Sequence, residues 1–210
     1  MSKTYKAVLY DLDGTIVNTL DMNMIPLMRV LEEETGRPWT WEQVLPYAPW
    51  PGLKVMESLH FPDPEAVYAR WVQAVNEYEN GATLFDGWMT VFERFQQAGI
   101  RQAVVSAKTR SQYALDVTAH GVDAFMETAV LADDTTKHKP DPAPIRLALE
   151  KLGLRPDEVL YIGDAPSDYE AANNAGVDFG WAKWGATMPL ELPDFVEVFE
   201  CPLDLLRLIP

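Results

Sequence analysis

The sequence predicts an α/β fold, a doubly wound parallel sheet that is interrupted after its first strand by a helical insert. Residues 6–10 form a short apolar segment with the pattern of a buried parallel strand. From about residue 84 onward, apolar segments alternate with segments of helical periodicity, as in βαβ units. Residues 19–81 carry helical patterns without a strand signal. The predicted domains are therefore a core of residues 1–18 and 82–210 and a helical insert of residues 19–81.

Composition and charge limit the function classes. A chain of 210 residues that is 48% hydrophobic and 23% charged is typical of a globular protein with a sizeable core. Its 17 Lys and Arg against 32 Asp and Glu give a net charge of -15 at pH 7. This acidity argues against nucleic acid and anionic membrane surfaces as partners. An anionic substrate therefore needs a local positive group, a lysine or a metal ion.

The sequence also predicts the compartment. Cys201 is the single cysteine, so no intramolecular disulfide is possible, and we interpret it as structural. The N-terminal residues lack an apolar signal region, and no run of 18 apolar residues occurs. We therefore expect a soluble cytoplasmic protein, either a monomer or a homodimer.

Within the insert, we expect helices over residues 21–34, 41–47 and 55–60 and from Pro64 to about Tyr78. Pro26 is expected in or near the first turn of the first helix, and Asp63 is expected to cap the last one. A loop rich in proline and aromatic residues lies between the second and third helices.

In the core, strands are expected at residues 101–105, 129–131 and 158–162, with a last and weaker strand at residues 177–181. The intervening helices are expected at residues 87–97, 111–120, 141–152 and from just after Asp164 to Gly176. Asp141 is the expected cap of the third of these helices.

Polar side chains follow several of these strands: Asp11 and Asp13, then Ser106, then Lys139 in a basic loop, then Asp164 and Asp168. The carboxyl ends of parallel strands meet at one edge of a sheet, where ligands bind. A cluster of carboxylates is costly without a divalent cation, and hard oxygen ligands suit Mg²⁺. A hydroxyl and a lysine suit the oxygens of a phosphate. The set therefore predicts phosphoryl transfer.

The ordered motifs resemble those of the haloacid dehalogenase-like (HAD) hydrolases. They are Asp11-x-Asp13-Gly14-Thr15, Ser106, Lys139-Pro140, and Gly163-Asp164 followed by Asp168. They are most similar to the branch that contains phosphoglycolate phosphatases and β-phosphoglucomutases, in which a helical cap follows the first motif. The resemblance spans roughly Ala7 to Gly185. Each motif is weak alone, but four in order are specific. The resemblance implies a Rossmann-like core with an inserted helical cap domain.

The resemblance also implies catalytic roles. Asp11 would attack phosphorus and form an aspartyl-phosphate. Asp13 would protonate the leaving oxygen and then deprotonate the hydrolytic water. Ser106 and the following backbone N–H would bind phosphoryl oxygens, and Lys139 would neutralise charge on the nucleophile and the phosphate.

The implied cofactor is Mg²⁺, held by the Asp11 carboxylate, the Asp13 backbone carbonyl and Asp164. Asp168 would assist nearby or through water.

Further candidate substrate-binding residues are Thr15, Ala107, Lys108, Trp50 and Lys54. Thr15 is expected to support its loop by hydrogen bonding. Ala107, followed by Lys108, stands where many relatives have Asn. Trp50, in the segment from Pro49 to Lys54, either stacks on the substrate or packs between helices. Lys54 is either a substrate contact or a surface lysine, with the surface reading favoured.

We therefore predict a Mg²⁺-dependent phosphatase acting on a small phosphorylated metabolite, with phosphoglycolate as the first choice and sugar phosphates and pyrophosphate close behind. Dehalogenases and phosphonoacetaldehyde hydrolases of this family lack the second aspartate, whereas Asp13 is present here. The alternatives are a phosphomutase, which shields its aspartyl-phosphate from water, and a non-enzymatic phospho-accepting protein.

Overall fold

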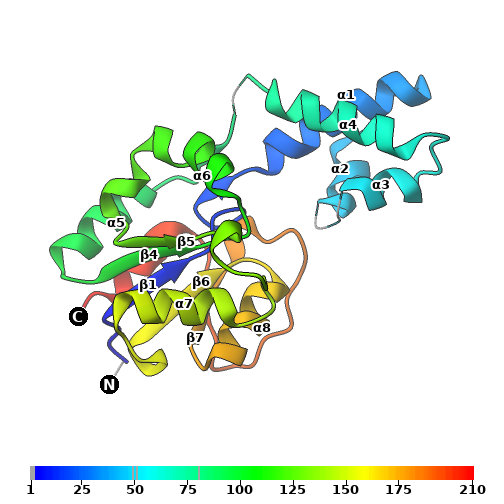
Figure 1. Cartoon of the computed structure of the whole chain (residues 1–210). Coiled ribbons are helices and arrows are strands. Elements are labelled where there is room, and N and C mark those ends of the chain that lie inside the picture. Colours follow the sequence, from blue (N-terminus) through cyan, green and yellow to red (C-terminus); the bar gives the residue numbers. More distant parts are fainter. Residues whose placement is uncertain (1–2, 49, 51, 80) are drawn as a thin grey trace. The chain divides into compact units, whose positions relative to one another are not determined.

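The computed structural model describes residues 3–48, 50, 52–79 and 81–210 (Figure 1). The chain folds into two compact units. We call the first, Met1–Val17 with Leu84–Pro210, the core unit, and the second, Asn18–Thr83, the helical unit.

A parallel sheet forms the centre of the core unit, and its strands lie in the order β5-β4-β1-β6-β7-β8. Each neighbouring pair of these strands is parallel. Their bounds are β1 Ala7–Tyr10, β4 Arg101–Val105, β5 Thr128–Val130, β6 Val159–Gly163, β7 Asp178–Ala182 and β8 Glu197–Phe199. From β1 the chain first builds outward to β5 and then crosses back to β6, on the other side of β1. This reversal confirms the predicted doubly wound sheet.

Helices cover both faces of the sheet because successive strand residues point in opposite directions. Leu9 belongs to a core cluster with Ile145 of α7 and Ala171 of α8. The next residue, Tyr10, packs edge-on against Trp88 of α5, with 5.1 Å between the ring centroids. The helices are α5 Trp88–Gln97, α6 Arg110–Asp116, α7 Ala143–Leu152 and α8 Pro166–Ala175. Short 3₁₀ segments are η2 Thr118–His120, η3 Val122–Phe125, η4 Ala132–Asp134, η5 Pro156–Glu158, η6 Lys183–Gly185 and η7 Pro202–Leu208.

The core unit contains a strand that the sequence did not predict, and several of its elements have different ends. The strand expected to be last, β7, is followed by β8, which pairs with it in parallel. β8 has three residues, of which only Phe199 is buried, so its alternation is too brief to be recognised. The helix expected to follow Asp141 begins at Ala143 with Pro142 as its N-cap, and the Asp141 carboxylate accepts the Ala143 N–H at 2.9 Å. The helix expected to reach residue 120 ends at Asp116 and continues as η2.

The helical unit contains α1 Leu20–Thr35, α2 Trp41–Val44, η1 Leu45–Tyr47, α3 Gly52–Ser58 and α4 Pro64–Asn76. The Asp63 carboxylate accepts the Ala66 N–H at 3.0 Å, so the predicted cap of α4 is confirmed. Pro26, expected in or near the first turn, lies inside α1. Helix α1 already starts at Leu20, whose N–H bonds to the Asn18 side chain at 3.2 Å, so Pro26 lies beyond that turn.

Strands β2 Val17–Asn18 and β3 Thr83–Leu84 pair where the chain passes from one unit to the other. Among the described residues, no helix has the length and apolar character needed to span a membrane.

Candidate active site

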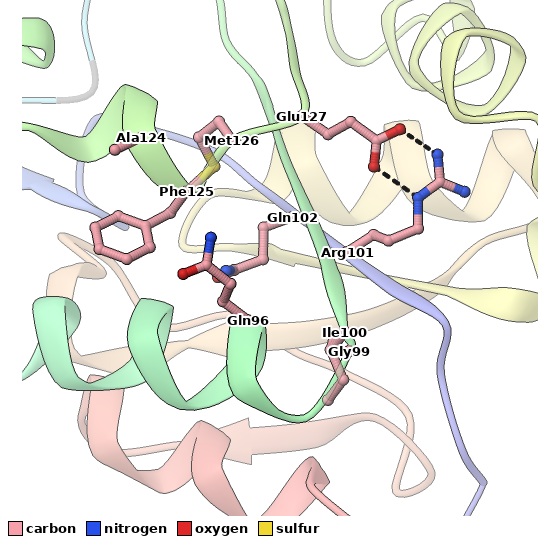
Figure 2. A pocket seen from close by; sticks show the side chains of 9 residues that line it. All are labelled: Gln96, Gly99, Ile100, Arg101, Gln102, Ala124, Phe125, Met126 and Glu127. Carbon is pink, nitrogen blue, oxygen red and sulfur yellow. Dashed lines mark hydrogen bonds and ion pairs between the residues drawn. The ribbon is translucent and has the colours of Figure 1, made fainter.

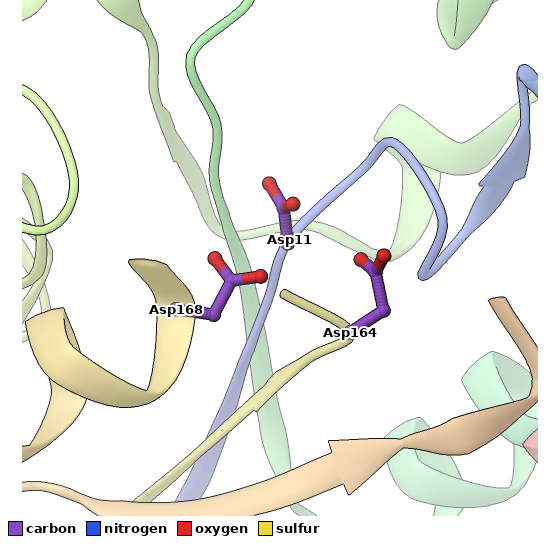
Figure 3. A group of neighbouring side chains, drawn as sticks. All are labelled: Asp11, Asp164 and Asp168. Atoms are coloured by element: carbon purple, nitrogen blue, oxygen red, sulfur yellow. The ribbon is translucent and has the colours of Figure 1, made fainter. Parts of the chain in front are cut away.

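Three aspartates lie together at the carboxyl ends of β1 and β6, beside the point where the strand order reverses (Figure 3). Asp11 follows β1 directly, and its N–H continues the ladder by donating to the Ile162 carbonyl at 2.9 Å. Asp164 follows β6, and Asp168 lies in the first turn of α8. One carboxylate oxygen from each aspartate lies within 4.8 Å of the others. Parallel register thus brings together acids far apart in sequence.

Lys139 lies among these acids. Its Nζ is 2.7 Å from Asp11 Oδ1 and 2.6 Å from Asp168 Oδ1. A third contact, of 3.1 Å, joins Nζ to the Tyr161 hydroxyl. Burial alone would lower the pKa of Lys139, but Asp11 and Asp168 raise it well above its ordinary value. Lys139 is therefore an ammonium whose three N–H groups all have partners.

The same crowding acts on the carboxylates. Burial raises the pKa of Asp11 to about 7; Lys139 opposes this rise, and Asp168 and Asp13 add to it. Burial also raises the pKa of Asp164 well above its ordinary range, with Asp168 adding to the rise. A bound cation would remove much of this cost, because it supplies the charge that the pocket lacks.

Asp168 is fully buried and held on both oxygens. Its Oδ1 lies within hydrogen-bond distance of Lys139 Nζ and of the Tyr161 hydroxyl, at 2.6 and 3.1 Å. Its Oδ2 accepts the Ala165 N–H at 3.1 Å. In this arrangement Asp168 fixes the position of Lys139, and Asp11 and Asp164 keep more of their oxygen lone pairs for a cation.

The loop after β1 is shaped around Asp164. Gly14 has φ of 75°, and a Cβ at this position would lie 2.3 Å from Asp164 Oδ2. The buried Thr15 hydroxyl donates to Asp164 Oδ1 at 3.1 Å, in line with its predicted supporting role. At Gly185 a Cβ would lie 1.6 Å from the Gly14 carbonyl oxygen. Both positions therefore require glycine.

Hard oxygen donors and a close backbone turn fit a divalent cation. Asp11 and Asp164 offer carboxylate oxygens, and the Gly14 turn leaves room beside Asp164 that a side chain would fill.

Asp13 and Ser106 border the same strand ends. The Asp13 side chain is 42% exposed, and its Oδ1 lies 3.1 Å from Lys108 Nζ. Ser106 is buried after β4, with its N–H bonded to the Val130 carbonyl at 2.9 Å. Its Oγ accepts the Lys108 N–H at 3.1 Å, which fixes the turn, while Ala107 between them is exposed.

Trp50 and Lys54 belong to the helical unit. The Lys54 ammonium lies 5.0 Å from the Trp50 ring centroid, and the Tyr47 ring meets Trp50 edge-on at 5.8 Å. The Trp50 side chain is 40% exposed. Pro49 and Pro51, which belong to the same predicted loop, lie outside the described residues.

Sequence reasoning missed three supporting side chains. Tyr161 contacts both Lys139 and Asp168, and its hydroxyl also lies 3.2 Å from the Val105 carbonyl. The indole N–H groups of Trp88 and Trp184 both donate to the Thr15 carbonyl at 2.9 Å. A signal existed for Tyr161 alone: it stands two residues before Gly163 and so shares its face of the strand.

A separate surface hollow of about 300 Å³ lies at the start of β4 (Figure 2). It is lined by Gln96, Gly99, Ile100, Arg101, Gln102, Ala124, Phe125, Met126 and Glu127. The Arg101 guanidinium pairs with the Glu127 carboxylate at its rim, with a contact of 2.7 Å from Nε. Because Arg101 begins β4 and Ser106 follows it, the hollow lies at the opposite end of this strand from the aspartates.

Comparison with known proteins agrees with this geometry. The family model of haloacid dehalogenase-like hydrolases matches residues 8–182. Pyrophosphatase PpaX of Bacillus velezensis is 30% identical over 213 residues, covering 98% of this chain and 97% of that protein. A crystal structure from Lactobacillus plantarum, provisionally assigned as a phosphoglycolate phosphatase, has a TM-score of 0.81 and 29% identity, covering 98% of this chain and 99% of that one.

A more distant structure shares the fold. CbbY of Rhodobacter sphaeroides, solved in complex with phosphate, has a TM-score of 0.70 at 19% identity, covering 98% of this chain and 99% of that one. The match over residues 8–182 confirms the resemblance found in the sequence, and the chain belongs to the haloacid dehalogenase-like hydrolases as an enzyme of the phosphatase type.

Proposed function

We propose that this enzyme is a Mg²⁺-dependent phosphatase that hydrolyses a small phosphorylated metabolite through an aspartyl-phosphate on Asp11. One observation carries the proposal. Asp11 lies at the end of the central strand, 2.7 Å from a buried ammonium and within 4.8 Å of two further carboxylates. Lys139 and a bound Mg²⁺ would together keep this carboxylate ionised as a nucleophile and offset the charge of an incoming phosphate.

In the first step, an Asp11 carboxylate oxygen forms a bond to phosphorus as the bond to the leaving oxygen breaks. Lys139 holds the nucleophile in place and offsets the charge that builds up on it. The Ser106 hydroxyl and the backbone N–H of Ala107 are the groups proposed to bind phosphoryl oxygens, since both follow β4 next to β1.

Asp13 is the proposed acid and base. It gives its proton to the leaving oxygen and then takes a proton from the water that attacks phosphorus; the bond between phosphorus and the Asp11 oxygen breaks, and phosphate leaves. The partial exposure of its side chain suits both tasks, because leaving group and water must each reach it.

A Mg²⁺ ion would be held by the Asp11 carboxylate, the Asp13 backbone carbonyl and Asp164. Asp168 would act on it through water, because its own oxygens already have protein partners. When bound, the ion would neutralise the carboxylates and phosphoryl oxygens.

The helical unit is the proposed cap, with a boundary near residues 18 and 83. Its Trp50 and Lys54 are proposed substrate contacts, since a cation beside an exposed aromatic ring offers both stacking and charge.

Among substrates, phosphoglycolate and pyrophosphate have the strongest support. A phosphoglycolate phosphatase assignment and a pyrophosphatase are found among proteins about 30% identical over nearly the whole chain. Sugar phosphates follow. A phosphomutase is the main alternative, distinguished by isomerised substrate without free phosphate.

The test is phosphate release from a panel of these compounds with Mg²⁺ and then with chelator. The proposal expects Mg²⁺-dependent release that disappears in Asp11→Asn and persists in Asp157→Asn, a control on an exposed side chain. Release that is unaffected by chelator, or that survives in Asp11→Asn, would contradict it.

A further inference from the structure

The ion pair between Lys108 and Asp13 places a cation beside the proposed proton donor. Lys108 stands two residues after Ser106, and its backbone N–H donates to Ser106 Oγ at 3.1 Å. Its side chain is only 12% exposed and ends with Nζ 3.1 Å from Asp13 Oδ1. A mostly buried lysine thus pairs with a carboxylate that is itself 42% exposed.

This position determines what the leaving group meets. A proton donor must come within about 3 Å of the oxygen that it protonates. Since Lys108 Nζ is 3.1 Å from the same carboxylate, the ammonium lies within about 6 Å of the leaving oxygen. A charged group whose oxygens lie two or three bonds beyond that oxygen is therefore able to reach Lys108.

The charges around the site make this cation necessary for some substrates and dispensable for others. Lys139 is already shared between Asp11 and Asp168. A leaving group with its own negative charge would otherwise enter a site rich in carboxylates, in a protein with a net charge of -15. A neutral leaving group meets no such repulsion. The positive charge of Lys108 thus distinguishes substrates with an anionic leaving group from substrates with a neutral one.

We propose that Lys108 is a specificity-determining residue that selects substrates whose leaving group carries a second anion, a carboxylate or a phosphate, next to the leaving oxygen. This inference rests on the proposed phosphatase function and names its substrate class. The second anion takes up part of the Lys108 contact that Asp13 holds in the free enzyme. Esters of neutral alcohols, including sugars, leave the Lys108–Asp13 pair intact and gain nothing from it.

The experiment compares phosphoglycolate with 2-amino-2-oxoethyl phosphate. In this compound a neutral amide replaces the carboxylate, the phosphate keeps its charge, and the shape is nearly the same. Pyrophosphate is the third substrate, because it replaces the carboxylate by a phosphate and so separates the two anions. The measured quantity is kcat/KM with Mg²⁺ for the wild type and for Lys108→Met, Lys108→Arg and Lys6→Met. Lys6 is the matched control: it also pairs with one carboxylate, Glu158, but at the opposite end of β1.

The wild type is expected to prefer phosphoglycolate over the amide. Lys108→Met is expected to lose roughly 10- to 100-fold in kcat/KM on at least one anion-bearing substrate and less than about 3-fold on the amide, because a charge-assisted contact is lost. If kcat/KM falls on phosphoglycolate alone, Lys108 recognises a carboxylate. If it falls on pyrophosphate alone, Lys108 recognises a phosphate. Lys108→Arg keeps most of the preference, and Lys6→Met keeps all of it.

Two results would overturn the proposal for Lys108 and leave the proposed function standing. One is a wild type that turns over the amide as well as the acid, and the other is a Lys108→Met variant whose kcat/KM falls equally on both. The wild-type comparison decides even where Lys108→Met fails to fold. Absence of Mg²⁺-dependent phosphate release from every compound in the wild type would overturn the proposed function, and this inference with it.

Discussion

The ammonium of Lys139 lies 2.7 Å from a carboxylate oxygen of Asp11, and both groups are buried. Lys139 also reaches Asp168 at 2.6 Å, so one cation balances two acids. Buried ion pairs of this kind are costly to break from one side, because the partner is left as an uncompensated charge. The Lys139 ammonium therefore matters both for the stability of the fold and for the proposed chemistry.

Replacing Lys139 by methionine should therefore destabilise the metal-free protein. We expect a loss of about 3–5 kcal/mol in the free energy of unfolding at pH 7, since Asp11 and Asp168 lose their shared cation. Urea denaturation in chelator measures it. The Lys6–Glu158 pair, in which the lysine side chain is 65% exposed, serves as control, and Lys6→Met should cost about 0–1 kcal/mol. Equal losses in the two variants would contradict a buried, shared ammonium.

Tyr161→Phe should loosen Lys139 without removing its charge. The Tyr161 hydroxyl lies 3.1 Å from both Lys139 Nζ and Asp168 Oδ1. We expect kcat/KM to fall about 10-fold, the size of one hydrogen bond to a charged group. Tyr10→Phe is the matched control, because its buried hydroxyl bonds to Gln102 on the other face of the sheet. If Tyr10→Phe lowers activity as much, the effect comes from packing.

Gly14→Ala should abolish cation binding, because the added Cβ would overlap the Asp164 carboxylate. Gly153→Ala is the control in the same unit: its φ is 63°, but nothing lies within 4 Å of the added Cβ. Both variants should lose about 1–2 kcal/mol of stability from the left-handed backbone. Only Gly14→Ala should lose Mg²⁺ affinity in a calorimetric titration. Retained affinity would place the cation away from Asp164.

The raised pKa of Asp11 predicts how stability changes with pH. In the folded metal-free protein the pKa of Asp11 is about 7, whereas an aspartate in the unfolded chain has a pKa of about 4. The folded state therefore binds more protons in this window, and the free energy of unfolding falls as pH rises through it. The raised pKa of Asp164 acts in the same direction.

Thermal denaturation in chelator between pH 4 and pH 8 measures this trend. Asp11→Asn removes one titrating acid and should flatten it, with a gain of about 1–3 kcal/mol at pH 7. Saturating Mg²⁺ should also flatten the wild-type curve. A wild-type stability that falls no more than that of Asp11→Asn between pH 5 and pH 7 in chelator would refute the crowding of carboxylates.

Much of the architecture follows from local sequence pattern. Buried strands such as β1 and β6 are continuous apolar runs, and the residue after each must lie at one edge of a parallel sheet. For this reason Asp11 and Asp164 could be expected together before any coordinates were known. Strand β8 could not, because three residues with one buried side chain carry almost no periodic signal.

Side-chain contacts between different helices, strands and loops were harder to predict from the sequence. The Tyr161 hydroxyl meets Lys139 only because the loop before α7 returns over β6, which no local pattern encodes. Trp88 and Trp184 converge on the Thr15 carbonyl from positions 73 and 169 residues away in sequence. The Lys108–Asp13 pair likewise depends on the neighbouring ends of β4 and β1. Such partners are set by tertiary packing.

Rapid acid quench followed by peptide mass spectrometry shows whether Asp11 carries the phosphoryl group. Enzyme mixed with Mg²⁺ and phosphoglycolate or pyrophosphate is quenched within the first turnover, and the modified peptide is sequenced. We expect a phosphoryl group on Asp11 that appears before free phosphate and is absent in Asp11→Asn. A phosphoryl group on another residue, or phosphate release in the first turnover with Asp11 unmodified, would contradict it.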